Sequence, residues 1–195
     1  QNPLGGIKGM LQLLERDLEH SGMETEPAKM MFSEIERIER LLKQLLMHSH
    51  PMPIKSQSFN LHELLDTVLS FERSSHPGLR FTAYYDASLP DIEADRDKLH
   101  QVFLNLVRNA SEACSADGRV RVLTRHCAHW ELAGTNLDPT RRYILVSIED
   151  EGPGIPEELR KNIFKPLFST KKQGTGLGLS ISFRLVESHG GQLRY

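Results

Sequence analysis

The residues best suited to chemistry are three closely spaced glycines near the end of the sequence. Gly174, Gly176 and Gly178 alternate with other residues between the basic pair Lys171-Lys172 and an apolar segment with helical spacing. Glycine allows positive φ angles and a close approach of the backbone, and the N-terminus of a following helix favours negative charge. We therefore expect this loop to hold phosphate groups against backbone N–H groups.

Two familiar phosphate loops do not fit this run. A dinucleotide-binding fingerprint requires a glycine where Leu179 stands and a strand directly before the run. A P-loop requires a lysine and then a serine or threonine after its last glycine, whereas this chain has Leu179-Ser180. On its own, the run would also suit a surface loop without a ligand.

A second candidate is a pair of asparagines one helical turn apart. Asn105 and Asn109 lie in a predicted helix from about Arg96 to Cys114, capped by Asp95. Asparagine is a mediocre helix former, so the pair favours a functional role over two tolerated surface residues. The apolar positions form one face of this helix, and the asparagines belong to a polar stripe on its border that we expect to face a cleft. The stripe is Lys98, Asn105, Asn109 and Glu112, and the apolar face is Leu99, Val102, Phe103, Leu106, Val107, Ala110 and Ala113.

A third candidate follows a predicted strand. The strand-like residues 143–148 run directly into an acidic segment that contains Asp150, Gly152 and Gly154. A carboxylate at a strand end can accept a hydrogen bond from a ligand, and the glycines leave room for a flat ring. An acidic turn without a ligand is the plainer alternative.

The N-terminal residues predict two helices that pair as an antiparallel hairpin. Apolar residues recur at steps of three and four on both sides of a break at Ser21-Gly22, and Pro27 suits the first turn of the second helix. Each stripe is wider than one partner helix can cover, so we expect two chains to form a dimeric four-helix bundle. Packing of the hairpin on its own chain is the alternative. The seam residues are Leu4, Ile7, Leu11, Leu14 and Leu18, then Met31, Ile35, Ile38, Leu42 and Leu45, and the residues that widen the stripes are Met10, Leu13, Leu41 and Leu46.

A domain boundary is expected at the end of the second helix, because Pro51 and Pro53 cannot continue it. His48 and His50 precede this boundary, and two histidines without a third ligand nearby favour solvated side chains over a metal site. The expected units are a helical one, 1–55, and a larger one, 56–195.

The larger unit mixes helices and strands, which predicts an α+β fold. Asn60 and Glu63 form a capping-box pattern, and Gly190-Gly191 stops the last helix. The expected helices are 60–73, 96–114, 156–163 and 177–188, and the expected strands are 79–85, 91–94, 120–124, 143–148 and a final, truncated one at 193–195.

The composition is that of an ordinary globular protein, with 195 residues, 38% hydrophobic and 26% charged. A formal net charge of -2 makes nucleic acid an unfavourable partner for the chain as a whole. Cys114 and Cys127 form no zinc pattern and suggest a reducing, cytoplasmic compartment. No apolar run approaches the ~20 residues of a membrane span. The abrupt start at Gln1 leads us to expect a piece of a longer protein.

In chain order, the asparagine pair, the Asp150 segment and the glycine run resemble the sequence boxes of two-component sensor histidine kinases. The resemblance covers nearly the whole chain, and it points most closely to the nitrogen-regulation branch of that family. The matching segments are Asn105-x-x-x-Asn109 for the N box, Asp150-x-Gly152-x-Gly154 for the first glycine box, Phe164 and Phe168 for the phenylalanine box, Gly174-Thr175-Gly176-Leu177-Gly178-Leu179 for the second glycine box, Pro3-Leu4-Gly5-Gly6-Ile7 for the first dimerisation helix, and Tyr85-Asp86-Ala87-Ser88-Leu89-Pro90 for the branch.

This resemblance implies an α/β sandwich that binds ATP and Mg²⁺ between a sheet and a lid. Asp150 would accept a hydrogen bond from the adenine amine, which disfavours guanine. Asn109 would offer its amide oxygen to Mg²⁺, and Asn105 would support the phosphates or the waters of the metal. Lys171 would neutralise the terminal phosphate, while Phe164 and Phe168 would anchor the lid by packing. The remaining implied nucleotide contacts are Gly152, Gly154, Gly174, Thr175, Gly176, Leu177 and Gly178.

Two positions differ from patterns elsewhere in the superfamily. Related gyrase and heat-shock chaperone ATPases carry a water-activating glutamate where Asn105 stands. An amide cannot accept that proton, so we expect this chain to hold ATP for transfer rather than to hydrolyse it. Many members of the wider family have a basic residue where this chain has Glu112. The resemblance therefore implies no phosphate contact for this position.

The resemblance also implies a phosphoacceptor outside the sequence. The family motif His-Glu-x-x-Asn-Pro matches Gln1-Asn2-Pro3 from its fourth position, which puts the accepting histidine three residues upstream of Gln1. Asn2 would position water for dephosphorylation of the partner. The expected protein is a homodimeric histidine kinase that passes its phosphoryl group to an aspartate in the receiver domain of a response regulator. A nucleotide-gated interaction or phosphatase module and a gyrase-like ATPase are the alternatives.

Overall fold

The computed structural model describes residues 3–20, 25–27, 29–31, 33–35, 53–171 and 174–195. The chain divides into two compact units, Gln1–Pro51 and Met52–Tyr195. Several positions singled out from the sequence lie outside the described residues. They are Asn2, the break at Ser21-Gly22, Ile38, Leu41, Leu42, Leu45, Leu46, His48, His50, Pro51 and Lys172.

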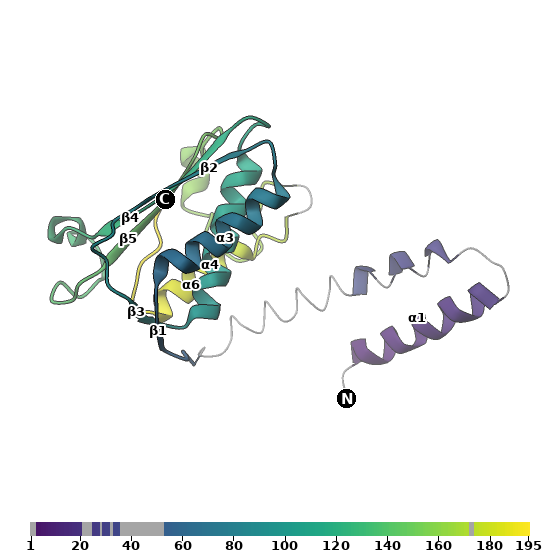
Figure 1. The fold of residues 1–195 in the computed structure, drawn as a ribbon. Helices are drawn as coiled ribbons and strands as arrows, with labels where there is room; N and C mark the ends of the chain where they lie inside the picture. Colours follow the sequence, from purple (N-terminus) through teal and green to yellow (C-terminus); the bar gives the residue numbers. More distant parts are fainter. Residues whose placement is uncertain (1–2, 21–24, 28, 32, 36–52, 172–173) are drawn as a thin grey trace. The chain divides into compact units, whose positions relative to one another are not determined.

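The first unit contains helix α1, Pro3–His20. Figure 1 shows the described helical residues between 26 and 35 lying alongside α1. Several apolar side chains of this unit are exposed, and they come from both helical segments. A single chain therefore leaves apolar surface uncovered here. The exposed apolar residues are Met10, Leu13, Leu14, Met30 and Met31.

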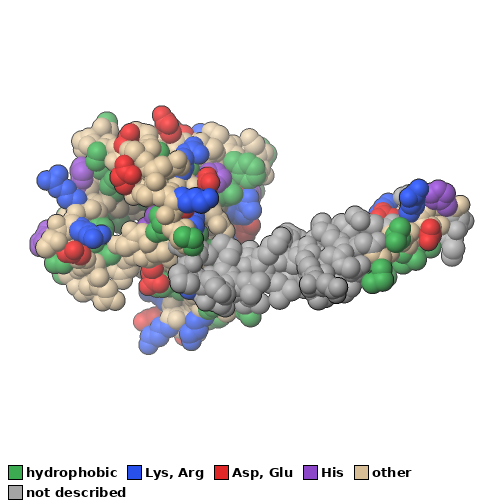
Figure 2. All heavy atoms as spheres, turned by 90° about the horizontal axis from the view of Figure 1, so that it is seen from below, with side chains coloured by type: hydrophobic (Ala, Val, Ile, Leu, Met, Phe, Trp, Pro, Cys, Tyr) green, Lys and Arg blue, Asp and Glu red, His purple; other side chains and the backbone are tan. Residues whose placement is uncertain are grey.

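The second unit alternates helices and strands, as the sequence predicts (Figure 1). Basic and acidic side chains are interspersed on the face shown in Figure 2, in keeping with the small net charge of -2. The elements are β1 (Gln57–Phe59), α3 (Leu61–Ser75), β2 (Arg80–Tyr85), β3 (Ile92–Ala94), α4 (Arg96–Ala113), β4 (Arg119–His126), the 3₁₀ turn η1 (His129–Leu132), β5 (Ile144–Asp150), α5 (Glu157–Arg160) and α6 (Gly178–Ser188).

The strands form one three-stranded sheet and one short pair. In the larger sheet, β4 lies in the middle, parallel to β2 and antiparallel to β5. β1 and β3 pair antiparallel with each other. Helices α3, α4 and α6 cover one face of the larger sheet (Figure 1), and the opposite face carries cross-strand ion pairs such as Arg121 with Glu149 at 3.1 Å. The unit is therefore a two-layer sandwich.

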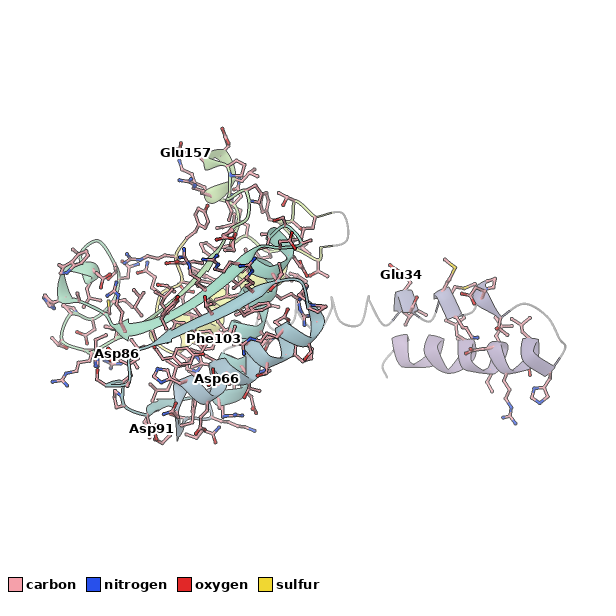
Figure 3. The ribbon with its side chains drawn as sticks, turned by 45° about the horizontal axis from the view of Figure 1, so that its top comes forward. Glu34, Asp66, Asp86, Asp91, Phe103 and Glu157 are labelled. Carbon is pink, nitrogen blue, oxygen red and sulfur yellow. The ribbon has the colours of Figure 1, made fainter. Side chains whose placement is uncertain are left out.

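The hydrophobic core lies between this sheet and the helices, with α4 packed against α3, α6 and the sheet. Phe103 of α4 is turned into this layer (Figure 3). The predicted apolar face of α4 is confirmed at four of its positions, while Leu99, Leu106 and Ala113 are half-buried. The four buried positions are Val102, Phe103, Val107 and Ala110, and the fully buried leucines and valines around them are Leu64, Leu65, Val68, Leu69, Val120, Val122, Leu177 and Leu185.

Both predicted helix N-caps are confirmed. The Asn60 side chain accepts hydrogen bonds from the N–H groups of His62 (2.9 Å) and Glu63 (3.3 Å). Asp95 does the same for Lys98 at 3.1 Å, which fixes the start of α4. These caps satisfy N–H groups that a helix leaves unpaired in its first turn.

Two predicted elements differ from the structure. Residues 193–195 were expected to begin a strand, but the structure assigns none to them. Side chains make the contacts of this tail: the Tyr195 hydroxyl accepts the N–H of Ile155 at 2.9 Å, and its ring lies under the guanidinium of Arg160. A strand requires a ladder of backbone hydrogen bonds, which side-chain contacts do not supply. The helix expected at 156–163 is shorter in the structure. It spans only α5, Glu157–Arg160, and is followed by turns.

Candidate functional site

Helix α4 is the element that carries both asparagines. The N–H of Lys55 donates to the Asp95 carboxylate at 3.0 Å, and with the N–H of Lys98 it holds the pKa of Asp95 below its ordinary value. The start of α4 is therefore tied to the chain that precedes β1. Two to four turns further on, Asn105 and Asn109 are half-buried at the edge of the core face.

Asn105 is in direct contact with the beginning of α6. Its Nδ2 donates to the hydroxyl of Ser182, which is buried, at 3.0 Å. Its Oδ1 faces Gly178 so closely that a Cβ on that residue would lie only 2.2 Å away. The fold thus brings together the first asparagine and the last glycine of the run, which are far apart in the sequence.

The glycine run turns sharply before it enters α6. Gly176 has a φ of +65°, and a Cβ there would lie 2.4 Å from the carbonyl carbon of Leu167, so no other residue fits without rearrangement. Leu177 is fully buried and precedes α6 without a side-chain cap, while the Thr175 hydroxyl accepts its N–H at 3.4 Å. The Leu177 side chain therefore caps none of the N–H groups in the first turn of α6, and the N-terminus of a helix favours an anion.

Asp150 lies at the end of β5 and begins a tight turn. Its Oδ1 accepts the N–H of Gly152 at 2.9 Å, and the carboxylate is exposed. Gly152 lies against the last turn of α4, since a Cβ on it would be 2.8 Å from the Cβ of Ala113. From Asn105 to Ala113 is about 12 Å along α4 at ~1.5 Å per residue. The acidic turn and the glycine loop therefore border the same helix, about two turns apart.

Lys171, the cation expected to meet a terminal phosphate, is paired with a carboxylate. Its Nζ contacts Oε2 of Glu112 in the last turn of α4. Just before this segment, the ring of Phe164 packs on Phe183 of α6 with centroids 5.2 Å apart. The predicted packing role is confirmed for Phe164, and Phe168 is half-buried.

One buried cluster of charged residues next to the site was not predicted from the sequence. Glu72 of α3 is 0% exposed and its Oε1 accepts from Nε of Arg108 at 3.2 Å, which ties α3 to the α4 turn between the two asparagines. Nδ1 of His76 is 3.1 Å from the other oxygen but lacks hydrogen-bond geometry. The signal was available, because Glu72 continues the apolar stripe of Val68 and Leu69.

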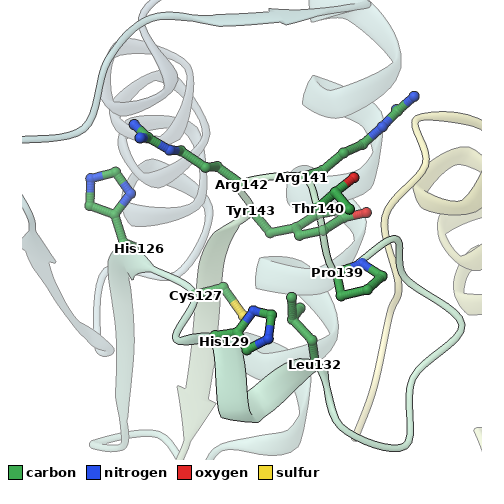
Figure 4. Close-up of a pocket in the computed structure, with 9 residues that line it drawn as sticks. All are labelled: His126, Cys127, His129, Leu132, Pro139, Thr140, Arg141, Arg142 and Tyr143. Atoms are coloured by element: carbon green, nitrogen blue, oxygen red, sulfur yellow. The ribbon is translucent and has the colours of Figure 1, made fainter.

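A cavity among the described residues lies away from this site. It has a volume of about 460 Å³ and lies beside the loop that joins β4 to β5 (Figure 4). Asp150 lies at the other end of this strand pair. The register from Val120 to His126 puts roughly 20 Å of strand between the two places, at ~3.3 Å per residue. No residue of the predicted nucleotide set is among those lining it, which are His126, Cys127, His129, Leu132, Pro139, Thr140, Arg141, Arg142 and Tyr143.

Two further observations concern the described residues only. They contain no cluster of three or more His, Cys, Asp or Glu side chains that would hold a metal ion. None of their helices is both long enough and apolar enough to span a membrane.

The sequence of the chain matches a known family. Residues 94–195 match the family described as histidine kinase-, DNA gyrase B- and HSP90-like ATPases, and the chain belongs to this family. Membership implies that the domain binds ATP. Within the family, the chain is 35% identical over 198 residues to the sensory histidine kinase/phosphatase NtrB of Azospirillum brasilense, with all of this chain and 49% of that protein covered. The NtrB of Rhodobacter capsulatus is 36% identical over 197 residues, with 98% and 54% covered.

Solved structures agree with this assignment. The catalytic domain of histidine kinase ThkA is 35% identical, with a TM-score of 0.56 over 68% of this chain and 80% of that one. ThkA in complex with the response regulator protein TrrA is 29% identical, with a TM-score of 0.62 over 98% and 53%. The chain spans about half the length of the NtrB relatives that it matches. It is homologous to the kinase core of two-component sensor proteins.

Proposed function

We propose that this chain is the catalytic core of a sensor histidine kinase, which binds ATP with Mg²⁺ and transfers the terminal phosphoryl group to a histidine. The observation that carries the proposal is the convergence on α4 of the glycine loop, through Asn105, and of the Asp150 turn, through Ala113. Helix α4 thus borders a carboxylate suited to a base and the N-terminus of α6, which is suited to phosphates.

The adenine end of the site is assigned to Asp150, Gly152 and Gly154. The exposed Asp150 carboxylate is held by the N–H of Gly152, which leaves its remaining acceptor capacity for an exocyclic amine. Guanine would present an acceptor at that place, so the site should favour ATP over GTP. This carboxylate supplies the selectivity, because backbone contacts alone would serve either base.

The phosphate end is assigned to the first turn of α6 and the loop before it. Gly174, Thr175, Gly176, Leu177 and Gly178 bring bare backbone close to the phosphates, and Lys171 supplies the positive charge for the terminal one. Leu177, the residue before α6, has no polar side chain that would compete with a phosphate for these N–H groups.

Mg²⁺ would be held by the amide oxygen of Asn109 together with phosphate oxygens. The half-buried Asn109, one turn beyond Asn105 on the same face, is a neutral oxygen donor of the kind that this cation accepts. When bound, the ion would neutralise charge on the phosphates.

Asn105 favours transfer over hydrolysis. Its Nδ2 is engaged by Ser182, so its Oδ1 is turned toward Gly178 and the phosphate end. An amide oxygen accepts a hydrogen bond but cannot take a proton from water at neutral pH, unlike a glutamate. Asn105 would therefore orient the phosphates or their waters without activating a water for attack.

The N-terminal unit is assigned to dimerisation and phosphotransfer. The exposed Met10, Leu13, Leu14, Met30 and Met31 are surface that a second copy would cover, which favours an antiparallel hairpin in a dimeric four-helix bundle. This unit would span 1–55 and the catalytic domain 56–195. The accepting histidine would lie three residues upstream of Gln1, and Asn2 would position water when the regulator is dephosphorylated.

A receiver domain of a response regulator is the proposed partner. ThkA, whose structure with a response regulator aligns with 98% of this chain, supports this assignment. The relatives named kinase/phosphatase support a second, phosphatase role for the same protein. We infer that the regulator docks on the helical unit, where the phosphohistidine would be.

The test is a labelling experiment with the chain extended about ten residues upstream of Gln1. Incubation with Mg²⁺ and ATP labelled at the terminal phosphate should give a protein-bound label that acid removes and base does not. Replacement of the upstream histidine by alanine is the control that should abolish it. Free phosphate released without any label on the protein would instead indicate an ATPase.

A further inference from the structure

An ion pair ties Lys171, the cation assigned to the terminal phosphate, to the last turn of α4, next to the Ala113 that borders the Asp150 turn. Nζ of Lys171, which precedes the glycine run, contacts Oε2 of Glu112, which is fixed in the last turn of α4. Both side chains are about two-fifths exposed, at 43% and 41%. Among the described residues, Glu112 is the only carboxylate that forms an ion pair with Lys171. The contact therefore brings a negative charge to the cation that the nucleotide would use.

Glu112 also lies on the same side of α4 as the asparagines. It follows Asn109 by three residues, and residues at that spacing are neighbours on a helix surface. A phosphate chain that approaches Asn109 thus comes close to this carboxylate. A carboxylate and a terminal phosphate are both anionic oxygen acceptors, so they compete for the same ammonium group.

We propose that Glu112 is a specificity-determining residue of the nucleotide site, which competes with the terminal phosphate of ATP for Lys171. The inference rests on the proposed function, since it assumes that ATP binds here. Binding of ATP exchanges the carboxylate for phosphate at Lys171, whereas ADP ends one phosphate earlier and leaves the pair in place. Glu112 therefore lowers the preference for ATP over ADP, and its pair with Lys171 forms again once the terminal phosphate has been transferred.

The size of the effect follows from the exposure of the pair. Exposed ion pairs are weak, and their measured strengths correspond to about two- to fivefold in an equilibrium constant. Removal of the carboxylate should therefore tighten ATP binding by that factor. It should change ADP binding less.

The experiment compares binding of Mg²⁺ with AMPPNP, a non-hydrolysable ATP analogue, and with ADP to residues 1–195 by calorimetry. Four proteins form a cycle: the unmodified chain, Glu112→Gln, Lys171→Met and the double variant. Glu112→Gln should bind AMPPNP about two- to fivefold more tightly and ADP almost unchanged. In the Lys171→Met background the same change should have no effect, because the cation under competition is gone. Glu93→Gln, an exposed carboxylate in β3, is the control and should bind like the unmodified chain.

Two results would overturn the inference. One is an AMPPNP affinity of Glu112→Gln equal to or weaker than that of the unmodified chain. The other is the same tightening with and without Lys171, which would indicate simple repulsion of phosphate by Glu112. Failure of the unmodified chain to bind either nucleotide would refute the proposed function itself, and this result is distinguishable from the first two.

Discussion

Replacing Gly178 by alanine tests how closely the glycine loop is fitted to α4. A Cβ at this position would lie 2.2 Å from Oδ1 of Asn105, so the two groups cannot keep their places. Helix propensity acts in the opposite direction, because Gly178 is the first residue of α6 and alanine is favoured over glycine in a helix by up to about 1 kcal/mol. The sign of the measured change decides which effect is larger.

We expect the contact to dominate. Moving the Asn105 side chain away breaks its 3.0 Å hydrogen bond to Ser182, a side chain that is only 1% exposed. Leaving a buried hydroxyl without its partner costs about 1–3 kcal/mol. After subtraction of the full gain in helix propensity, the free energy of unfolding should fall by up to about 2 kcal/mol.

The assay is urea unfolding followed by far-UV circular dichroism, with Asn105→Ala as a second background. Once Asn105 is shortened, the clash disappears, and alanine at position 178 should be neutral or mildly stabilising. The reasoning would be refuted if Gly178→Ala stabilised the unmodified chain. It would also be refuted if the substitution cost the same free energy in both backgrounds.

Three other predictions follow from the same contacts. Glu72→Ala should lower the free energy of unfolding by about 1.5–3 kcal/mol, because it removes the charge-assisted hydrogen bond between the buried Glu72 and the half-exposed Arg108; a loss too small to measure in thermal melts would contradict this. The N–H of Lys55 holds the pKa of Asp95 below its ordinary value of 3.8. The ionised carboxylate therefore stabilises the fold fully above pH 3.8, and this stabilisation is lost as the pH falls through the lower pKa of the folded state. The difference in urea midpoint between the unmodified chain and Asp95→Asn should shrink in acid, and a constant difference would contradict this. Asp150→Asn should weaken ATP binding and narrow the preference for ATP over GTP in a fluorescent-nucleotide titration, whereas an unchanged preference would rule out the assigned role.

Local signals in the sequence were sufficient for much of the fold. Asn60 and Asp95 cap α3 and α4 as predicted, because a cap depends on residues within one turn of each other. The apolar spacing of α4 likewise identified Val102 and Val107 as core residues. Tail residues 193–195 show the limit, since a strand depends on a partner that local pattern does not reveal.

The candidate site was harder to predict, because its contacts join distant elements. The asparagines and glycines stood out by residue type, but the contact of Asn105 with Gly178 exists only because α4 and α6 pack together. The pairs Glu72 with Arg108 and Glu112 with Lys171 join residues 36 and 59 positions apart. Charge on a helix surface does not indicate its partner until the helices are placed.

The central claim is that α4, the Asp150 turn and the glycine loop form one nucleotide site. Calorimetric titration of residues 1–195 with ATP and Mg²⁺, repeated on Asp150→Asn and Asn109→Asp, tests it most directly. The account predicts a saturable, single-site isotherm for the unmodified chain and clearly weaker binding for both variants. An unmodified chain that releases no heat, or variants that bind ATP as tightly as the unmodified chain, would contradict it.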